Sequence, residues 1–278
     1  MTTPAPLVDI GINLTHDSFD ADRGEVLANA RAAGLVHLVV TGSSLAASPA
    51  AQRLAAEHPA FLSSTAGVHP HHASELDAAG LAALEALTAA PGVVAVGECG
   101  LDYFRDYSPR ADQRRAFEQQ LALAVRTRKP LFLHQRDAHA DFVDMLKDLG
   151  RRAPQAVAHC FTGSRAEAEE YLAMGLHIGI TGWICDERRG QHLEEVVRHV
   201  PLERLMLETD GPYLLPRTLS PKPASRRNEP KYLTEVCRAV ARARREPIEL
   251  IARATTETAA RFFGLRALLD EREARATA

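Results

Sequence analysis

Short apolar runs alternate with Ala/Leu/Glu-rich stretches of helical periodicity along the chain. Several of these runs are apolar at nearly every position, which is typical of parallel strands covered on both faces. Strands are predicted at Leu7–Ile12, Val36–Thr41, Phe61–Val68, Val93–Glu98, Leu131–His134, Ala156–His159, His177–Thr181 and Leu205–Glu208. Helices are predicted at Asp22–Ala33, Pro49–His58, Gly80–Ala89, Ala111–Arg128, Ala138–Gly150, Arg165–Met174, Leu193–His199, Tyr232–Arg245, Pro247–Arg253 and Thr256–Phe263.

Strands followed by helices indicate an α/β fold made of right-handed βαβ units. Eight such strands favour a closed (β/α)8 TIM barrel over an open doubly wound sheet. No Gly/Ser/Pro-rich linker interrupts the pattern, so we expect residues 1–265 to form a single barrel domain and residues 266–278 to form a charged C-terminal tail. The Pro- and Arg-bearing segment Leu214–Pro230 after the eighth strand is predicted to be a long functional loop.

Composition and charge restrict the class of protein. A hydrophobic share of 46% and a charged share of 25% are ordinary for a globular domain, and the net charge of -3 excludes a chain-wide basic field. The four cysteines form no CxxC pair, which favours reduced thiols in the cytoplasm. We find no signal peptide and no apolar stretch of roughly 18 residues, so a cytoplasmic protein without membrane contact is expected.

Four polar residues stand where apolar runs give way to loops: Glu98, His134, His159 and Asp210. The carboxyl ends of parallel barrel strands converge at one mouth, where such barrels carry their chemistry. Imidazole and carboxylate groups are ligands for a hydrolytic divalent cation, and Asp210 could also take a proton from water bound to it. A single histidine at a strand end is as often a buried structural residue as a ligand, so the metal site is predicted from the whole set.

The third strand is followed by three histidines in GVHPHH. His69 is a candidate contact to substrate or metal, and His71 a candidate orienting group near the substrate. Cys99 is expected to point away from Glu98 because successive strand side chains alternate between faces. Glu208 is expected on the opposite face from Asp210, paired with a basic residue.

Arginines and an amide in the loops are candidates for binding phosphate. Arg136 could present its planar guanidinium to a phosphate or instead pair with Asp137. A second candidate clamp consists of Arg226, Arg227 and Asn228. Its arginines could instead pair with carboxylates of the same loops, namely Glu229 and Glu187. Three aromatic residues near the strand ends could stack on bases or simply pack, namely Tyr103, Phe104 and Tyr213.

Seven segments together resemble the TatD family of metal-dependent deoxyribonucleases: GVHPH, GECGLDY, LHQRDA, AHCFTG, ITGWICDERRG, ETDGPYLLPR and PKPASRRNEP. The similarity runs from about Asp9 to Gly264. It implies a TIM barrel of the metallo-dependent hydrolase type and Mg²⁺-dependent 3′-5′ exonuclease action on single-stranded DNA or RNA, in DNA repair or turnover. It also implies metal binding by Glu98, His134 and His159, with Asp210 as a fourth ligand or as the acid–base group.

The first strand departs from the pattern of many family members. They begin with Asp/Thr-x-His-x-His, whereas this chain has Gly11 and Asn13 in place of the two histidines, as does the branch of the family that it resembles most. Fewer nitrogen ligands leave a site richer in oxygen, which favours Mg²⁺ or Mn²⁺ over Zn²⁺. The number of metal ions, one or two, stays open.

Other functions fit the same ligands. An aminoacyl-tRNA ester hydrolase would use nearly the same groups. A small-molecule amide hydrolase of this barrel type commonly carries a carbamylated lysine on the fourth strand, where this chain has Glu98. A non-catalytic binding protein would have no need for four polar groups at buried strand ends. We expect a monomeric enzyme, and its preference between DNA and RNA stays open.

Overall fold

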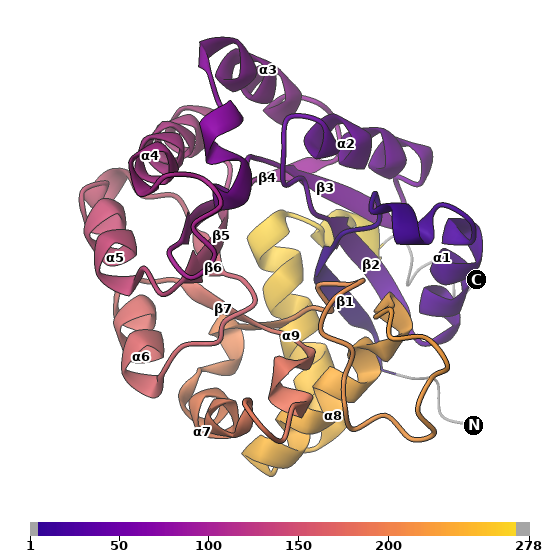
Figure 1. Ribbon diagram of the computed structural model, residues 1–278. Coiled ribbons are helices and arrows are strands. Elements are labelled where there is room, and N and C mark those ends of the chain that lie inside the picture. Colours follow the sequence, from indigo (N-terminus) through magenta and orange to yellow (C-terminus); the bar gives the residue numbers. More distant parts are fainter. Residues whose placement is uncertain (1–4, 271–278) are drawn as a thin grey trace.

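Eight parallel strands pair in chain order into one sheet in the computed structural model, which describes residues 5–270 (Figure 1). The strands are β1 (Leu7–Ile12), β2 (Leu35–Val40), β3 (Leu62–Ala66), β4 (Val93–Asp102), β5 (Leu131–Arg136), β6 (Ala156–Ala158), β7 (His177–Ile180) and β8 (Leu205–Leu207). All eight coincide with the predicted strands to within a few residues. The predicted TIM barrel is therefore confirmed.

Helices surround the strands, most of them in an outer ring (Figure 1). They are α1 (Arg23–Ala32), α2 (Ala47–Glu57), α3 (Ala78–Thr88), α4 (Arg110–Thr127), α5 (His139–Lys147), α6 (Arg165–Ala173), α7 (Gln191–His199), α8 (Leu233–Arg244) and α9 (Ile248–Phe263). The two last predicted helices are one helix, α9, which corrects the sequence prediction. Its threonines lie within the continuous helix, and the Thr255 hydroxyl donates to the carbonyl of Ile251 at 2.8 Å, one turn earlier.

Backbone hydrogen bonds close the barrel between its last and first strands. The N–H of Asp210 donates to the carbonyl of Gly11 at 2.8 Å, and the N–H of Asn13 donates to the carbonyl of Gly211 at 2.8 Å. These bonds bring the end of β8 beside the end of β1, although about 200 residues separate them in sequence. Asp210 and Asn13 are consequently neighbours at the carboxyl end of the barrel.

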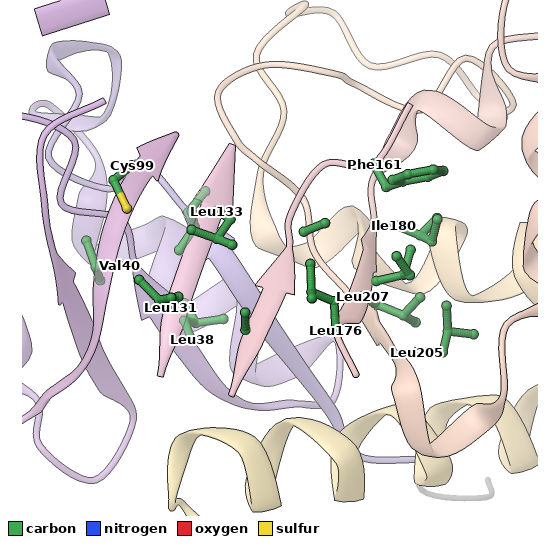
Figure 2. Close-up of a cluster of buried hydrophobic side chains, with 14 of the residues drawn as sticks. Leu38, Val40, Cys99, Leu131, Leu133, Phe161, Leu176, Ile180, Leu205 and Leu207 are labelled. Carbon is green, nitrogen blue, oxygen red and sulfur yellow. The ribbon is translucent and has the colours of Figure 1, made fainter. Parts of the chain in front are cut away.

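Side chains of the strands alternate between two apolar layers. Leu131 and Leu133 point outward toward the helices, in the layer that Figure 2 shows together with Leu205 and Leu207. Phe132 points inward, in a second cluster that includes Val39, Val157 and Met206. This inner cluster also contains Phe262 and Phe263 of α9, the helix seen within the ring of outer helices in Figure 1. The inner cluster therefore packs the barrel interior against α9.

The C-terminal segment is described only in part. Residues 266–270 are helical, and the rest of the predicted charged tail lies outside the described residues. None of the helices between residues 5 and 270 combines the length and the apolar character that crossing a membrane requires.

Candidate metal centre

A bulge in β4 turns Glu98 into the barrel. Val96 lies in the outer apolar layer, so regular alternation would also direct residue 98 outward. The pairing of β4 with β5 shifts register between Gly97 and Cys99, which places Cys99 in the outer layer and frees Glu98 to face inward. Cys99 thus points away from Glu98, as expected, and packs in the core (Figure 2).

The glycines beside Glu98 permit this bulge. Gly97 and Gly100 have φ angles of +132° and +147°, and a Cβ at Gly100 would lie 1.8 Å from the carbonyl oxygen of His134. Only glycine adopts such angles readily and leaves room for the backbone of β5. These glycines therefore let β4 approach β5 closely.

Three imidazoles surround one carboxylate oxygen of Glu98. Its Oε1 lies 2.7 Å from Nε2 of His159, 3.3 Å from Nδ1 of His134 and 3.4 Å from Nε2 of His69. His134 belongs to β5, His159 follows β6, and His69 follows β3 at the start of the 3₁₀ turn Pro70–Glu75. Donor atoms of His69, Glu98 and His134 all lie within 4.8 Å of one another, which is close enough to hold one cation.

The charges in this cluster are strongly coupled. Burial alone would raise the pKa of Glu98, but His69 and His159 outweigh it and hold that pKa well below its usual range. Burial disfavours protonation of His159, yet the carboxylates of Glu98 and Glu208 raise the pKa of this histidine well above its usual value. Burial lowers the pKa of His69 well below the ordinary value. The cluster therefore has an affinity for positive charge beside Glu98.

Asp210 lines the same cavity as Glu98 and His159. Its Oδ1 accepts a hydrogen bond from Nδ2 of Asn13 at 3.0 Å. Burial raises the pKa of Asp210 to about 7, and the nearby carboxylates of Glu98 and Glu208 act in the same direction. A carboxyl group with a pKa near neutrality is suited to accept or donate a proton at physiological pH.

Glu208 lies inside the barrel, contrary to the prediction. It is fully buried, its Oε2 lies 3.2 Å from Nδ1 of His159, and its Oε1 accepts a hydrogen bond from the N–H of Cys160. Strand periodicity explains the error, because Met206 lies in the inner cluster and residue 208, two positions further on, continues the same face. A Cβ at Gly11 would lie 2.5 Å from Glu208 Oε2, so this carboxylate fills the space in front of Gly11.

Asp102 is a further candidate site residue, which could not be singled out from the sequence motifs alone. Its Oδ2 lies 2.8 Å from Nε2 of His71 and 3.4 Å from Nε2 of His134. Burial alone would raise its pKa, but the imidazoles of His134 and His71 hold that pKa far below the usual range. A second acid in GECGLDY, four residues after Glu98 on the same strand, was the available signal.

Of the predicted phosphate contacts, Arg136 is the one whose side chain lines the cavity. Within residues 5–270 it forms no ion pair, with Asp137 or any other acid, and its guanidinium lies 4.3 Å from the ring centre of Phe104. His69 and His71 line the same cavity.

The predicted clamp after the eighth strand has a different arrangement. The guanidinium of Arg227 pairs with Asp22 at 2.6 Å and with Glu229 at 3.1 Å, as the alternative reading of this loop anticipated for Glu229. Asn228 is buried and donates to the carbonyl of Thr209 at 2.8 Å. Arg226 is exposed and stands apart from the residues that line the cavity. Arg227 and Asn228 therefore hold the loop against the barrel beside Asp210.

The side chains present fit a divalent cation. Nε2 of His134 is buried and lies 3.4 Å from Asp102 Oδ2 without forming a regular hydrogen bond, an arrangement that is costly unless another group binds this nitrogen. Imidazole nitrogens and carboxylate oxygens together are the donors that Mn²⁺ and Zn²⁺ accept, and Mg²⁺ accepts the oxygens. The cavity they line has a volume of about 650 Å³, enough for a bound cation and part of a larger substrate.

Known proteins similar to this chain match it over nearly its whole length. The sequence profile of the family described as TatD related DNase matches residues 8–264. The 3'-5' ssDNA/RNA exonuclease TatD of Edwardsiella piscicida is 50% identical over 259 residues, which cover 93% of this chain and 100% of that protein.

Solved structures of the family share the fold. A TatD family hydrolase from Entamoeba histolytica matches with a TM-score of 0.86 at 26% identity, covering 94% of this chain and 99% of the other. A TatD homologue from Escherichia coli K12 matches with a TM-score of 0.82 at 30% identity, covering 93% and 98% of the two chains. The resemblance of the motifs is thereby confirmed, and the chain belongs to the TatD related DNase family.

Proposed function

We propose that this protein is a metal-dependent phosphodiesterase that removes nucleotides from the 3′ end of single-stranded DNA and RNA. The observation that carries the proposal is the contact of three imidazoles with Glu98 Oε1, beside Asp210, in a cavity at the carboxyl ends of the strands. The relative from Edwardsiella piscicida, whose name gives this activity and substrate, shares half of its residues with this chain.

Glu98, His134 and His159 would hold the cation, with His69 and Asp210 completing its ligands. We propose Mg²⁺ or Mn²⁺, because Asn13 and Gly11 contribute no imidazole and Asp210 and Asn13 add oxygen atoms. When bound, such a cation lowers the pKa of a water ligand and neutralises charge on the phosphoryl oxygens.

The chain's own residues then position and move protons. Asp210 accepts the proton of the attacking water, because its pKa of about 7 lets the carboxylate take up a proton near neutral pH. Glu208 orients His159 from the side opposite Glu98. Arg136 contacts a phosphate of the strand, since its guanidinium faces the cavity without a carboxylate partner among residues 5–270.

A degradation assay tests the proposal. Oligonucleotides blocked at the 3′ end should resist the protein, whereas those blocked at the 5′ end should be shortened in the presence of Mg²⁺ or Mn²⁺ and spared in EDTA. Glu98→Ala should remove this activity. Glu170→Ala is a matched control, because its carboxylate also contacts an imidazole, His139 at 2.9 Å, but outside the cavity.

The substrate that is hydrolysed distinguishes an exonuclease from an aminoacyl-tRNA ester hydrolase. Aminoacyl-tRNA and polynucleotides are offered to the same preparation, and release of amino acid without shortening of any polynucleotide would contradict the exonuclease proposal. Shortening of DNA and RNA at different rates would give the preference between them.

We also propose that the protein acts as a monomer in the cytoplasm, in DNA repair or turnover, with residues 1–265 as one domain. All four cysteines are free, which is typical of a reducing compartment. Four large hydrophobic side chains are exposed among the described residues, and two of them line the cavity, so little apolar surface is left for a partner subunit. Light scattering of the purified protein measures the oligomeric state.

A further inference from the structure

Exposed aromatic rings stand at the mouth of the metal cavity. Phe104 is 53% exposed and Tyr213 is 53% exposed, and both line the cavity together with the half-buried Trp183. Large rings left in water at a cavity mouth are a recurrent mark of a binding surface. None of these rings belongs to the cluster around Glu98 Oε1.

Arginine side chains lie on these rings. The guanidinium of Arg136 lies 4.3 Å from the ring centre of Phe104 and 5.8 Å from that of Trp183, so that it stands between the two. Arg189 lies 4.6 Å from the Trp183 ring. We call Phe104, Arg136 and Trp183 the aromatic rim.

Arg136 differs from another arginine that lies on a ring nearby. Arg110 lies 4.3 Å from the ring centre of Tyr103, but its guanidinium is bound by the carboxylate of Asp106 at 2.9 Å. Arg136 has no such acid among residues 5–270, and its N–H groups are left for a ligand. The difference in pairing indicates that an anionic group binds at Arg136.

The aromatic rim is held in place before substrate binds. Backbone N–H groups of Phe104 and Arg105 both donate to Asp102 Oδ1, at 3.0 and 2.8 Å, which fixes the turn after β4. The N–H of Trp183 donates to Thr181 Oγ1 at 3.3 Å after β7. Because Arg136 ends β5, between these two strands in the barrel, the three side chains converge from separate rigid elements.

We propose that the aromatic rim binds the bases at the 3′ end of the strand by stacking, with Arg136 on the phosphate between them. This inference rests on the proposed function and adds the residues that select unpaired nucleotides. Each base offers a flat face to a ring or a guanidinium, whatever its identity. In a duplex these faces are covered by neighbouring pairs, so the rim discriminates against double strands.

Steady-state kinetics on substrates lacking one base test the stacking. Phe104→Ala should raise KM for hexathymidylate by about 5- to 100-fold while kcat stays within about two-fold. On hexamers with an abasic site at one of the three 3′-terminal positions, this penalty should disappear for the position whose base stacks. An equal penalty on every abasic hexamer, or an unchanged KM, would overturn the proposal.

Salt dependence separates the ring from the guanidinium. Arg136→Gln should lower the slope of log affinity against log salt concentration by about 0.7, the value for one phosphate contact on a single strand. Phe104→Ala should weaken binding without changing this slope. Arg110→Gln, the matched control, should change neither, and a slope unchanged by Arg136→Gln would contradict the phosphate contact.

A further measurement does not depend on hydrolysis. Trp183 is the only tryptophan of the chain, so its fluorescence reports on the rim alone. Hexathymidylate should quench it when fluorescence anisotropy shows binding, and an abasic strand of equal length should quench it far less. Equal quenching by both strands would overturn the stacking proposal. Quenching by hexathymidylate alone, without any shortening of the strand, would refute the exonuclease proposal but leave the aromatic rim as a binding site.

Discussion

At the scale of single residues, the candidate centre depends on one carboxylate oxygen that three histidines share. Glu98 Oε1 is contacted by His159, His134 and His69, and His159 is held from its other side by Glu208. Carboxylates behind ligating histidines fix the ring orientation and raise its basicity. The carboxylate of Asp102 contacts the rings of His134 and His71 in the same way.

Replacing Asp210 with Asn should reduce kcat by about 10²- to 10⁴-fold, because the amide cannot accept the proton of the attacking water. The amide keeps the shape of the carboxyl group and its contact with Asn13, so the urea midpoint should stay close to that of the unchanged protein. Rates of oligonucleotide shortening measure the effect. Near-normal turnover in this variant would remove Asp210 from the mechanism.

Affinity for Mn²⁺ should rise with pH. Glu98 and Glu208 raise the pKa of His159 in spite of its burial, so the metal-free centre retains a proton that a cation must displace. While His159 is protonated, the association constant should increase up to about ten-fold per pH unit, because one proton is released. Titration calorimetry at several pH values measures it. Glu208→Gln should flatten the dependence, and identical curves for both proteins would contradict this explanation.

At the scale of secondary-structure elements, the bulge in β4 is the feature that makes the centre. Without the register shift after Gly97, the side chain of residue 98 would share the outer face with Val96. The bulge also carries Asp102 to the mouth, where its carboxylate holds the turn that bears Phe104. One irregularity in one strand thus positions both the candidate metal centre and the aromatic rim.

Gly100→Ala should destabilise the fold by at least about 2 kcal/mol and abolish cation binding. Its φ of +147° is strained for alanine, and the added Cβ would lie 1.8 Å from the His134 carbonyl, so β4 must move away from β5. Urea unfolding and a Mn²⁺ titration measure the two effects. Gly24→Ala is the control, because nothing lies within 4 Å of its Cβ, and helix α1 should gain up to about 1 kcal/mol.

At the scale of the whole molecule, α9 packs against the barrel interior near the amino-terminal ends of the strands. His177, the first residue of β7, lies 4.9 Å from the ring of Phe262 in α9, and its surroundings are largely buried. Burial lowers the pKa of His177 to about 4, with Arg204 acting in the same direction. The folded state therefore favours the neutral form of this histidine.

Lowering the pH should decrease the free energy of unfolding through protonation of His177. Since the pKa is 6.5 in the unfolded chain and about 4 in the folded one, the unfolded state binds more protons between these values. The stabilisation is fully present above pH 6.5 and is lost as pH falls toward 4, up to about 3 kcal/mol in total. Urea unfolding of His177→Gln from pH 7 to 4 should show a smaller loss than the unchanged protein, and parallel curves would assign the acid sensitivity elsewhere.

The sequence by itself determined the elements and the strand ends where the chemistry lies. Alternation of short apolar runs with helical stretches is a local property, so the eight strands, the barrel and the positions of Glu98, His134, His159 and Asp210 could be predicted. The motifs of the family extended this to the reaction class.

Only the tertiary structure decided which way several of those side chains point. The bulge that turns Glu98 inward arises from pairing with β5, and Glu208 fills the space before Gly11 because β8 closes on β1. Arg227 is bound by Asp22 across 205 residues of chain, whereas Arg136 remains open to the cavity. These outcomes depend on contacts between distant segments, and local periodicity contains no information on such contacts.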